Sequence, residues 1–355
     1  MIKYRFEDES VGQSAREQVD AVFDGRSERA LAIRGTIQYS PPTERRSLQH
    51  GSLLFEVVLN SPRKAEIGRQ ELDKRSAEVA EIPESGKATL AEHKEPCAYA
   101  AISDQKIFGL ECDGIDFDVI VNIKPWSRGH IMMTKAEHVG QVLHASELRT
   151  ALLFLQSLGS DYEGVFSGVL AGASVFHYHF HYHRGSAAVW QNLDAGRVIS
   201  QPVWAKHGAR LLRVAGWPAE AFLFVGADPS ELAEVVGVML DAFVEGENDI
   251  PFNLGCRYEF GLFRVLVFPR ATDHNHSLAL ERPQTLNDFP GSWGRFAFEE
   301  MGGSVFLLVP DAFKATEPRN VNDAIGQMSA SLDSVNLLTD IFAARVGAKL
   351  GASVK

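Results

Sequence analysis

The sequence of 355 residues predicts an α+β fold of two tandem halves, each an antiparallel sheet flanked by helices. The first observation that supports this prediction is the order strand, turn, strand, helix, strand, strand in residues 98–215. The other is a weaker copy of that order in residues 216–355, which lacks the histidines of the first. Residues 1–97 are more polar and read as an N-terminal arm and connecting segment.

The N-terminal segment contains one clear element. Leu53–Leu59 is an apolar run of strand length, bounded on both sides by polar residues. Residues 1–50 are mostly polar, and residues 60–96 are rich in charged residues and poor in apolar ones. We therefore expect this segment to lie over the rest of the molecule.

The first half begins with two strands, Phe117–Asn122 and His130–Thr134, joined by a turn. Ser146 can cap a helix, and two more strands follow at Phe166–Gly172 and Phe176–His183. The apolar residues of the predicted helix recur at helical spacing: Leu148, Ala151, Leu152 and Leu155.

The second half repeats this order. Phe222–Val225 reads as a strand, and Asp228 followed by Pro229 is typical of a helix N-terminus, with the helix running to about Glu245. Two strands follow, at 251–256 and 263–269. A final long helix is predicted from apolar residues on one face: Val321, Ile325, Met328, Leu332 and Val335.

Composition and charge limit the function. At 45% hydrophobic and 23% charged residues, the chain is typical of a folded protein. The formal net charge of −11 and the lack of a basic tract argue against binding to nucleic acid. A phosphorylated small substrate remains compatible, because a few cations and backbone N–H groups can hold phosphates.

The cysteines and the hydropathy pattern suggest a location. Cys97, Cys112 and Cys256 are too far apart in the sequence for a CxxC clamp and odd in number, which favours a reducing cytoplasm. The charged N-terminus is unlike a secretion signal, and no window reaches the ~20 apolar residues of a membrane span. We expect no membrane partner.

Four histidines alternate with aromatic residues near position 180. Because successive side chains of a strand point to opposite faces, His177, His179, His181 and His183 would share one face. Tyr178, Phe180 and Tyr182 would form the other face. Several neighbouring imidazoles repel one another when protonated and need partners when neutral, so a purely structural role is disfavoured.

Two chemical uses of this row compete. Imidazoles two residues apart on a strand can bind zinc or iron, as in a metal-dependent oxygenase or isomerase. Alternatively, one imidazole is a nucleophile, and its neighbours position it and a phosphate group. The second reading is favoured by the preceding Gly172, Ala173 and Ser174, which would bring backbone N–H groups and a hydroxyl close to the histidines. We therefore predict no metal ligands.

A second segment would complete such a site. The strand and turn from residue 122 to 130 offer an amide, two cations and an imidazole. These are the substrate-binding candidates of the turn: Asn122, Lys124, Arg128 and His130.

These residues resemble a known superfamily. The pattern Asn-x-x-Pro-x-x-x-Gly-His, then a helix, then Gly-x-Ser-x-x-His-x-His-x-His is similar to that of the histidine-triad (HIT-like) nucleotide hydrolases and transferases. Its larger relatives are galactose-1-phosphate uridylyltransferase, diadenosine tetraphosphate phosphorylase and the GDP-hexose phosphorylases. They carry two such halves, of which one is catalytic, so the resemblance implies a degenerate second half.

The likeness to the GDP-hexose phosphorylases extends over most of the chain, including residues 59–63, 249–254, 265–269 and 298–305. It implies phosphorolysis of a nucleoside diphosphate hexose to a hexose 1-phosphate and a nucleoside diphosphate. A dinucleoside polyphosphate phosphorylase or hydrolase, and a nucleotide-binding protein without turnover, remain as alternatives. The partners implied are a nucleotide or nucleotide sugar, inorganic phosphate and a second copy in a homodimer. No resident cofactor is implied beyond Mg²⁺ that accompanies the nucleotide.

The resemblance also assigns roles. The middle histidine of the run, His179, would be the nucleophile, flanked by His177 and His181. The larger relatives usually have glutamine where this chain has His181, so the acceptor, whether phosphate, water or a sugar phosphate, stays open. The extra His183 allows a shifted register, in which His181 would be the nucleophile.

Overall fold

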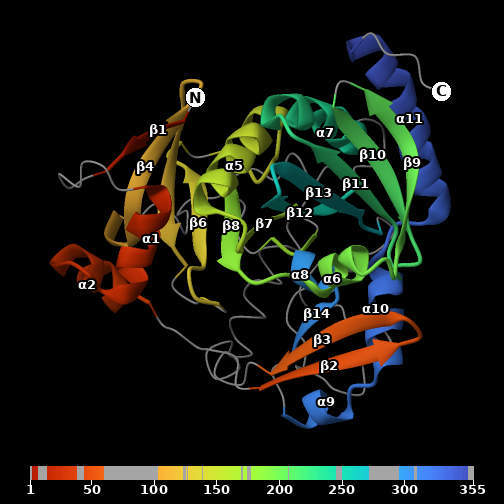
Figure 1. Cartoon of the computed structure of the whole chain (residues 1–355), viewed down its shortest axis with the longest axis horizontal. Helices are drawn as coiled ribbons and strands as arrows, with labels where there is room; N and C mark the ends of the chain where they lie inside the picture. Colours follow the sequence, from red (N-terminus) through yellow and green to blue (C-terminus); the bar gives the residue numbers. More distant parts are fainter. Residues whose placement is uncertain are drawn as a thin grey trace.

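The structure is a computed structural model, and the elements below belong to the residues that it describes. These are residues 2–6, 14–37, 44–59, 103–122, 125, 127–137, 139–168, 171–173, 177–206, 208–244, 250–271, 296–307 and 310–350. Figure 1 shows one large sheet with helices against it and a small sheet beside it. The α+β fold class is therefore confirmed.

The large sheet has eleven strands, and every neighbouring pair is antiparallel. In spatial order the strands are β1 (Ile2–Arg5), β4 (Lys106–Cys112), β5 (Ile115–Val121), β6 (Ile131–Lys135), β8 (His179–Arg184), β7 (Tyr162–Ser167), β12 (Phe252–Glu259), β13 (Leu262–Pro269), β11 (Ala221–Gly226), β10 (Ala209–Ala215) and β9 (Ile199–Lys206).

This strand order contains two related halves. Strands β4 to β8 are arranged 4-5-6-8-7, and strands β9 to β13 follow as 12-13-11-10-9, the same order reversed. Each half has a long helix after its third strand, α5 (Ala145–Leu158) and α7 (Pro229–Val244). The duplication expected from the sequence is present, and β7 pairs with β12 where the halves meet.

The structure groups the strands differently from the predicted ranges. Residues 199–215 form β9 and β10, which lie beyond β11 and belong to the second set of strands. The predicted boundary at 215/216 falls between β10 and β11. The division into 1–97, 98–215 and 216–355 otherwise stays a prediction, because residues 60–102 lie outside the described part of the chain.

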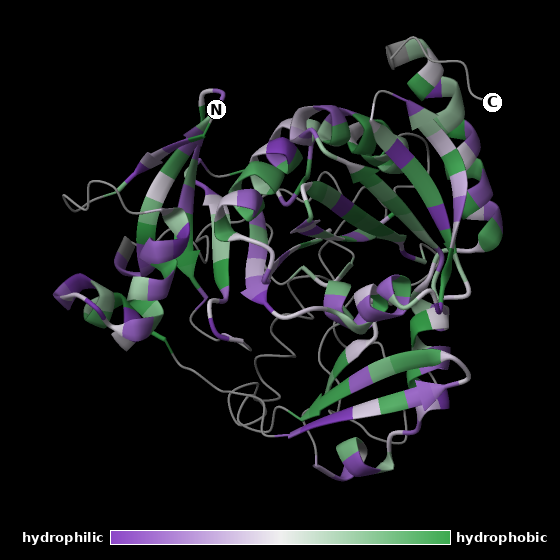
Figure 2. Ribbon diagram, in the orientation of Figure 1, coloured by the Kyte–Doolittle hydropathy of each residue, from purple (hydrophilic) through white to green (hydrophobic). Residues whose placement is uncertain are grey.

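The N-terminal segment joins the two sheets. Strand β1 pairs with β4 at one edge of the large sheet, and two helices follow it, α1 (Ala15–Asp24) and α2 (Glu28–Gly35). The predicted strand at Leu53–Leu59 is confirmed as β3. It pairs with β2 (Glu44–His50) and, in parallel, with β14 (Ser304–Leu307) in the small sheet. Figure 2 shows that the outer strand β2 is largely hydrophilic.

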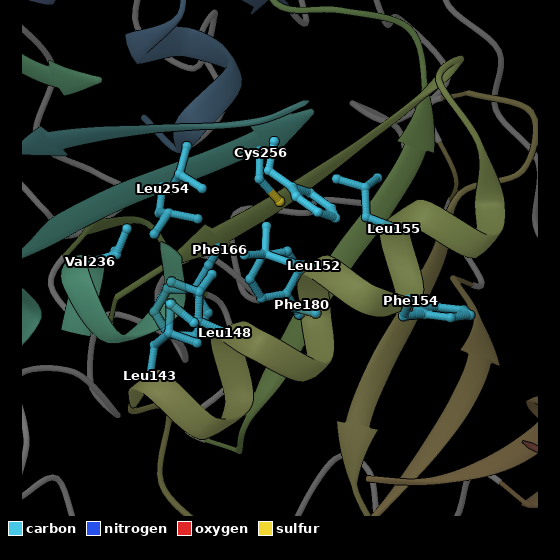
Figure 3. Packing of buried hydrophobic residues seen from close by; sticks show 14 of the residues in the cluster. Leu143, Leu148, Leu152, Phe154, Leu155, Phe166, Phe180, Val236, Leu254 and Cys256 are labelled. Carbon is cyan, nitrogen blue, oxygen red and sulfur yellow. The ribbon is translucent and has the colours of Figure 1, made fainter. Parts of the chain in front are cut away.

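One face of the large sheet is covered by α5 and α7. The predicted apolar residues of α5 are all buried, and Figure 3 shows Leu148, Leu152 and Leu155 packed against Phe166 and Phe180 of the sheet. The N-cap residue is His144, two residues before the expected Ser146. Its backbone N–H donates to the Glu147 carboxylate, at 3.2 Å.

The other face carries a second apolar cluster beneath α8 (Phe298–Met301), α6 (Ala188–Asp194) and the small sheet. Helix α8 lies close over β12 because Gly255 has no side chain. A Cβ atom there would be 2.0 Å from the Phe298 ring. This close approach brings Glu299 and Glu300 of α8 to the face of the sheet that carries the histidines.

The single C-terminal helix predicted across residues 321–335 is broken in the structure. Instead of one long helix, the chain forms α9 (Pro310–Ala315), α10 (Pro318–Met328) and α11 (Leu332–Leu350). The break follows from strand-like pairing, since the Ala330 N–H donates to the Pro269 carbonyl at 3.0 Å. Of the five residues predicted on one face, Leu332 is 53% exposed and the other four are buried. None of the described helices is long and apolar enough to cross a membrane.

Candidate active site

Three of the four histidines lie on one face of β8. The strand begins at His179 and not at Phe176 as predicted, and residues 174–176 lie outside the described part of the chain. The ring centroids of His179 and His181 are 4.9 Å apart. On the opposite face, Tyr178, Phe180 and Tyr182 are fully buried under α5. The predicted alternation is therefore confirmed for β8, and His177 precedes the strand.

The ring of His179 is held by a hydrogen bond to the backbone. Its Nδ1 lies 2.8 Å from the carbonyl oxygen of His177. Because a carbonyl oxygen can only accept a hydrogen bond, Nδ1 carries the proton. The neutral imidazole then has its lone pair on Nε2. This is the tautomer that a nucleophilic histidine needs.

His177 is fixed in the opposite tautomer. Its Nε2 lies 2.9 Å from the carbonyl oxygen of Lys135, so Nε2 carries the proton. The Lys135 ammonium group lies 2.6 Å from the carboxylate of Glu147 on α5. Burial alone would raise the pKa of Glu147, but the hydrogen bond and charge of Lys135 lower it below its usual value. The pair anchors the strand end that receives the His177 ring.

Gln141, which no sequence pattern singled out, positions His179. Its side chain is 4% exposed, and its Oε1 accepts a hydrogen bond from the His179 N–H at 2.8 Å. Its Nε2 donates to the carbonyl oxygens of His179 and Ser167, each at 3.0 Å. The amide thus ties the beginning of β8 to the end of β7. A single glutamine between a strand and a helix carries no recognisable sequence signal.

His130 and Asn122 lie next to His181. The Nε2 of His130 is 3.0 Å from Nδ1 of His181 and 3.1 Å from the Asn122 amide nitrogen. Since that amide nitrogen can only donate, His130 Nε2 accepts from Asn122, and the Nδ1 of His181 faces the same ring nitrogen. The ring of His181 is therefore oriented by another titratable ring, whereas that of His179 is oriented by the backbone.

A buried group of charges lies at the far end of the row. His183 is 4% exposed, and its Nε2 lies 3.3 Å from the carboxylate of Glu299 on α8. Glu163, opposite His183 on β7, is fully buried and accepts hydrogen bonds from the Ala187 N–H at 3.0 Å and from the indole of Trp190. No sequence pattern predicted either carboxylate at the site.

The histidine and the two carboxylates shift one another's protonation. Burial alone would lower the pKa of His183, but the hydrogen bond and charge of Glu299 and the charge of Glu163 raise it above the ordinary value. Burial raises the pKa of Glu163, while the positive charge of His183 acts in the opposite direction. The ring centroid of His183 lies 6.0 Å from that of His130, so this group borders the imidazole row.

The loop before the histidine row requires glycine. Gly172 has a φ of +95°, and a Cβ atom there would be 2.8 Å from the Phe296 carbonyl oxygen. The N–H groups of Ala171 and Ala173 donate to the Gly168 carbonyl, at 2.9 and 3.3 Å. Ser174, the predicted hydroxyl of this loop, lies outside the described residues, so its expected role stays a prediction.

Of the two predicted cations, Arg128 lies within the described residues. Lys124 lies outside the described residues. The guanidinium of Arg128 forms an ion pair with Asp24 at the end of α1, and its side chain is 58% exposed. A helix of the N-terminal segment therefore holds Arg128 in this structure, in place of the expected phosphate. Among the described residues, no group of three or more His, Cys, Asp or Glu side chains is arranged to hold a metal ion.

The fold and the histidine row define the architecture as a HIT-like one with tandem halves, of which the second has no histidines on β13, the strand equivalent to β8. Similar solved structures are those of yeast Ap4A phosphorylase Apa2. One superposes with a TM-score of 0.61 at 15% identity, covering 90% of this chain and 96% of that chain.

Two further structures of the yeast enzyme contain nucleotides. The complex with Ap4A gives a TM-score of 0.59 at 15% identity, covering 90% of this chain and 99% of that chain. The complex with AMP gives 0.54 at 13% identity, with 89% and 97% covered. No protein-family model matches this chain, and no curated protein sequence matches it.

Proposed function

We propose that this protein is a nucleotidyltransferase in which His179 carries the nucleotidyl group between donor and acceptor. The observation that carries the proposal is the hydrogen bond from His179 Nδ1 to the His177 carbonyl, which assigns the lone pair to Nε2. A backbone carbonyl cannot change its role as pH changes, so this tautomer persists while the ring is neutral. The likeness of the fold to Ap4A phosphorylase supports the same class of chemistry.

In the first step, Nε2 of His179 attacks the α-phosphorus of the donor, and the bond from that phosphorus to the bridging oxygen breaks. The bridging oxygen leaves with the remaining phosphate. In the second step, an oxygen of inorganic phosphate attacks the same phosphorus. The phosphorus–nitrogen bond breaks, a nucleoside diphosphate is released, and His179 returns to its neutral form.

The chain's main contribution is to position and stabilise the phosphates. In this proposal the phosphates are bound by the loop backbone at Gly172 and by Ser174, while Asn122 and His130, which are hydrogen-bonded to each other, line the row beside His181. Preorganised N–H donors stabilise charge on phosphoryl oxygens, which is the principal task in phosphoryl transfer. Mg²⁺, where it takes part, would enter with the phosphates of the nucleotide.

The donor we propose is a nucleoside diphosphate hexose of the GDP-hexose type, which would release a hexose 1-phosphate. The sequence likeness to GDP-hexose phosphorylases supports this choice. A dinucleoside polyphosphate is the second candidate donor, favoured by the similarity of the fold to Ap4A phosphorylase. The covalent intermediate is the same for both, so one experiment can test the mechanism and separate the donors.

The test is intact-mass spectrometry after brief exposure to GDP-hexoses, other nucleotide sugars or dinucleoside polyphosphates, without phosphate. We expect a mass gain of one nucleotidyl group, that is a nucleoside monophosphate minus water, in the wild type and in His50→Ala, a substitution of an exposed histidine on β2. His179→Ala should show no gain, and added phosphate should discharge the adduct as a nucleoside diphosphate. If no donor modifies the wild type, the proposed mechanism is wrong. If several donors do, the one that reacts fastest identifies the base and the leaving group.

A further inference from the structure

The second half contributes a buried polar pair next to the loop of residues 171–173, the candidate phosphate loop. Asn253 lies on β12 and Arg270 follows the end of β13, and their exposed fractions are 0% and 1%. Neither residue belongs to the histidine row or to the wall formed by Asn122 and His130. A buried amide and a buried guanidinium need defined partners, because leaving either unpaired is costly.

The partners of Asn253 lie in the first half. Its Nδ2 donates to the carbonyl oxygen of Ala171 at 2.6 Å and to the hydroxyl of Ser167 at 3.0 Å. Ser167 ends β7, and Ala171 begins the loop that leads to the histidines. One amide group therefore fixes both ends of residues 168–170 from the neighbouring strand.

Arg270 determines which way this amide faces. Its Nη1 lies 2.5 Å from the Asn253 Oδ1. A guanidinium can only donate, so the oxygen of the amide must face it and the nitrogen must face Ala171. The reversed amide would bring donor against donor at the arginine. The orientation of Asn253 is therefore set by charge.

Arg270 also contacts the backbone that packs against this loop. Its Nη1 donates to the Phe296 carbonyl oxygen at 2.8 Å, and its Nε donates to the Met328 carbonyl at 3.0 Å. The Phe296 carbonyl is the atom that faces Gly172, where it leaves no room for a side chain. The same guanidinium thus contacts both the Asn253 amide and the Phe296 carbonyl against which Gly172 packs.

The guanidinium brings positive charge close to this loop. Burial lowers the pKa of Arg270, while the negative charge of Glu300 acts in the opposite direction, and the group remains a cation at neutral pH. Within the described part of the chain, its Nη2 makes no hydrogen bond. A cation in surroundings of low dielectric favours anions bound nearby, as phosphates at the loop would be.

We propose that Asn253 and Arg270 form a clamp through which the second half positions the Ala171–Gly172–Ala173 loop for the phosphates of the donor. The two residues are positioning residues, which act through the loop and not by touching the reacting atoms. The inference rests on the proposed nucleotidyl transfer by His179 and extends it. It gives the half that lacks the histidine row a role in the reaction.

Asn253→Asp is the sharpest variant. It keeps the volume and the oxygen that faces Arg270, and it removes the donor to Ala171 and Ser167. Asn192→Asp is the matched control, because the buried Asn192 also donates to two carbonyl oxygens, of Leu54 and Ala188, each at 2.8 Å. These carbonyls lie in the small sheet and in α6, away from the loop.

The first measurement is hydrogen exchange of peptides that cover residues 168–178. We expect faster exchange in Asn253→Asp and in Arg270→Gln than in the wild type, and no change in Asn192→Asp. This measurement needs no substrate, so it tests the clamp even if the wild type forms no adduct. Unchanged exchange in both clamp variants would overturn the inference.

The second measurement is the rate and final amount of nucleotidyl adduct at saturating donor. A misplaced phosphate slows the reaction, and a displacement of about 1 Å can cost on the order of 10²-fold. We expect Asn253→Asp to lose roughly that factor in rate while still reaching one adduct per chain, with the same pH dependence as wild type. If Asn253 served only the stability of the fold, Asn253→Asp would lower the final amount of adduct and not its rate of formation. A wild-type rate of adduct formation in Asn253→Asp would contradict the clamp. Absence of the adduct in the wild type would count against the proposed function alone.

Discussion

The imidazole of His179 donates its Nδ1 proton to the carbonyl oxygen of His177, two residues earlier, over 2.8 Å. The same residue receives a second constraint from Gln141, which accepts the His179 N–H and donates to its carbonyl. The Nδ1 of His181 instead lies 3.0 Å from Nε2 of another titratable ring, that of His130. The difference between the two rings favours His179 as the nucleophile over the shifted register.

Exchanging each histidine for glutamine tests the register. His179→Gln should lose adduct formation by at least about 10⁴-fold, since removal of a nucleophile abolishes the covalent step. His181→Gln places at this position the residue that the larger relatives usually carry, and we expect it to slow the reaction by no more than about 10²-fold, the lower range for a proton-transfer group. Stopped reactions analysed by intact mass give both rates. The reverse ranking would assign the nucleophile to His181.

Gln141→Leu should destabilise the fold. The substitution leaves the N–H and carbonyl of His179 and the carbonyl of Ser167 without their buried partner, at a cost of about 2–4 kcal/mol. Urea denaturation measures this difference in the free energy of unfolding. Gln49→Leu is the control, because the exposed Gln49 donates only to the Gly51 carbonyl, at 3.0 Å, and should change stability by less than about 0.5 kcal/mol. Equal effects of the two substitutions would contradict the role of Gln141.

The pair of His183 and Glu299 should make stability depend on pH. The folded-state pKa of His183 is raised above 6.5, so the proton is bound more tightly in the folded chain than in the unfolded one. Its contribution to stability is complete below pH 6.5 and is lost as the pH rises through the folded-state pKa. Glu163, whose pKa is also raised, acts with the same sign at lower pH.

His183→Gln should remove this dependence. The variant should lose more stability, relative to the wild type, at pH 6 than at pH 8.5, as measured by urea denaturation at both values. His50→Gln, at an exposed position, should show no such difference. A stability gap that widened with rising pH would mean that His183 is neutral in the fold.

Gly172→Ala should damage both the fold and the loop. The new methyl group would meet the Phe296 carbonyl oxygen at 2.8 Å, at a φ of +95°, and we expect a loss of about 3 kcal/mol from strain and displaced backbone. Gly196→Ala is the matched control, because its φ is +65° and no atom lies within 4 Å of the added carbon. Its cost should be about 1 kcal/mol, from backbone conformation alone. Thermal unfolding of the two variants tests this difference.

The sequence was sufficient for features that depend on neighbouring residues. Alternation of imidazole and aromatic residues predicted the two faces of β8, because side chains of a strand point to opposite sides. The helix signal at Asp228 and Pro229 was equally local, and Asp228 accepts hydrogen bonds from the Ser230 and Glu231 N–H groups at 2.9 and 2.8 Å. The repeated order of elements similarly indicated two related halves.

Other local signals were overridden by contacts with distant parts of the chain. The periodicity from Val321 to Val335 predicted one helix, yet residues 329–331 leave the helical conformation to pair with the end of β13. Arg128 stood beside the predicted phosphate site, yet an aspartate of α1, over a hundred residues earlier, pairs with it. Local pattern does not record these competing partners.

By itself, the sequence determined which imidazoles share a face and which residues precede them, because strand geometry is set within a few residues. Only the tertiary structure decided what surrounds them: Gln141 behind His179, Glu299 against His183, and Asn253 with Arg270 beneath the loop. These groups come from different strands, loops and helices, and the order in which strands join a sheet brings them together. A buried polar side chain must find its partner wherever the fold places one, and its own neighbours in the sequence do not specify which residue that will be.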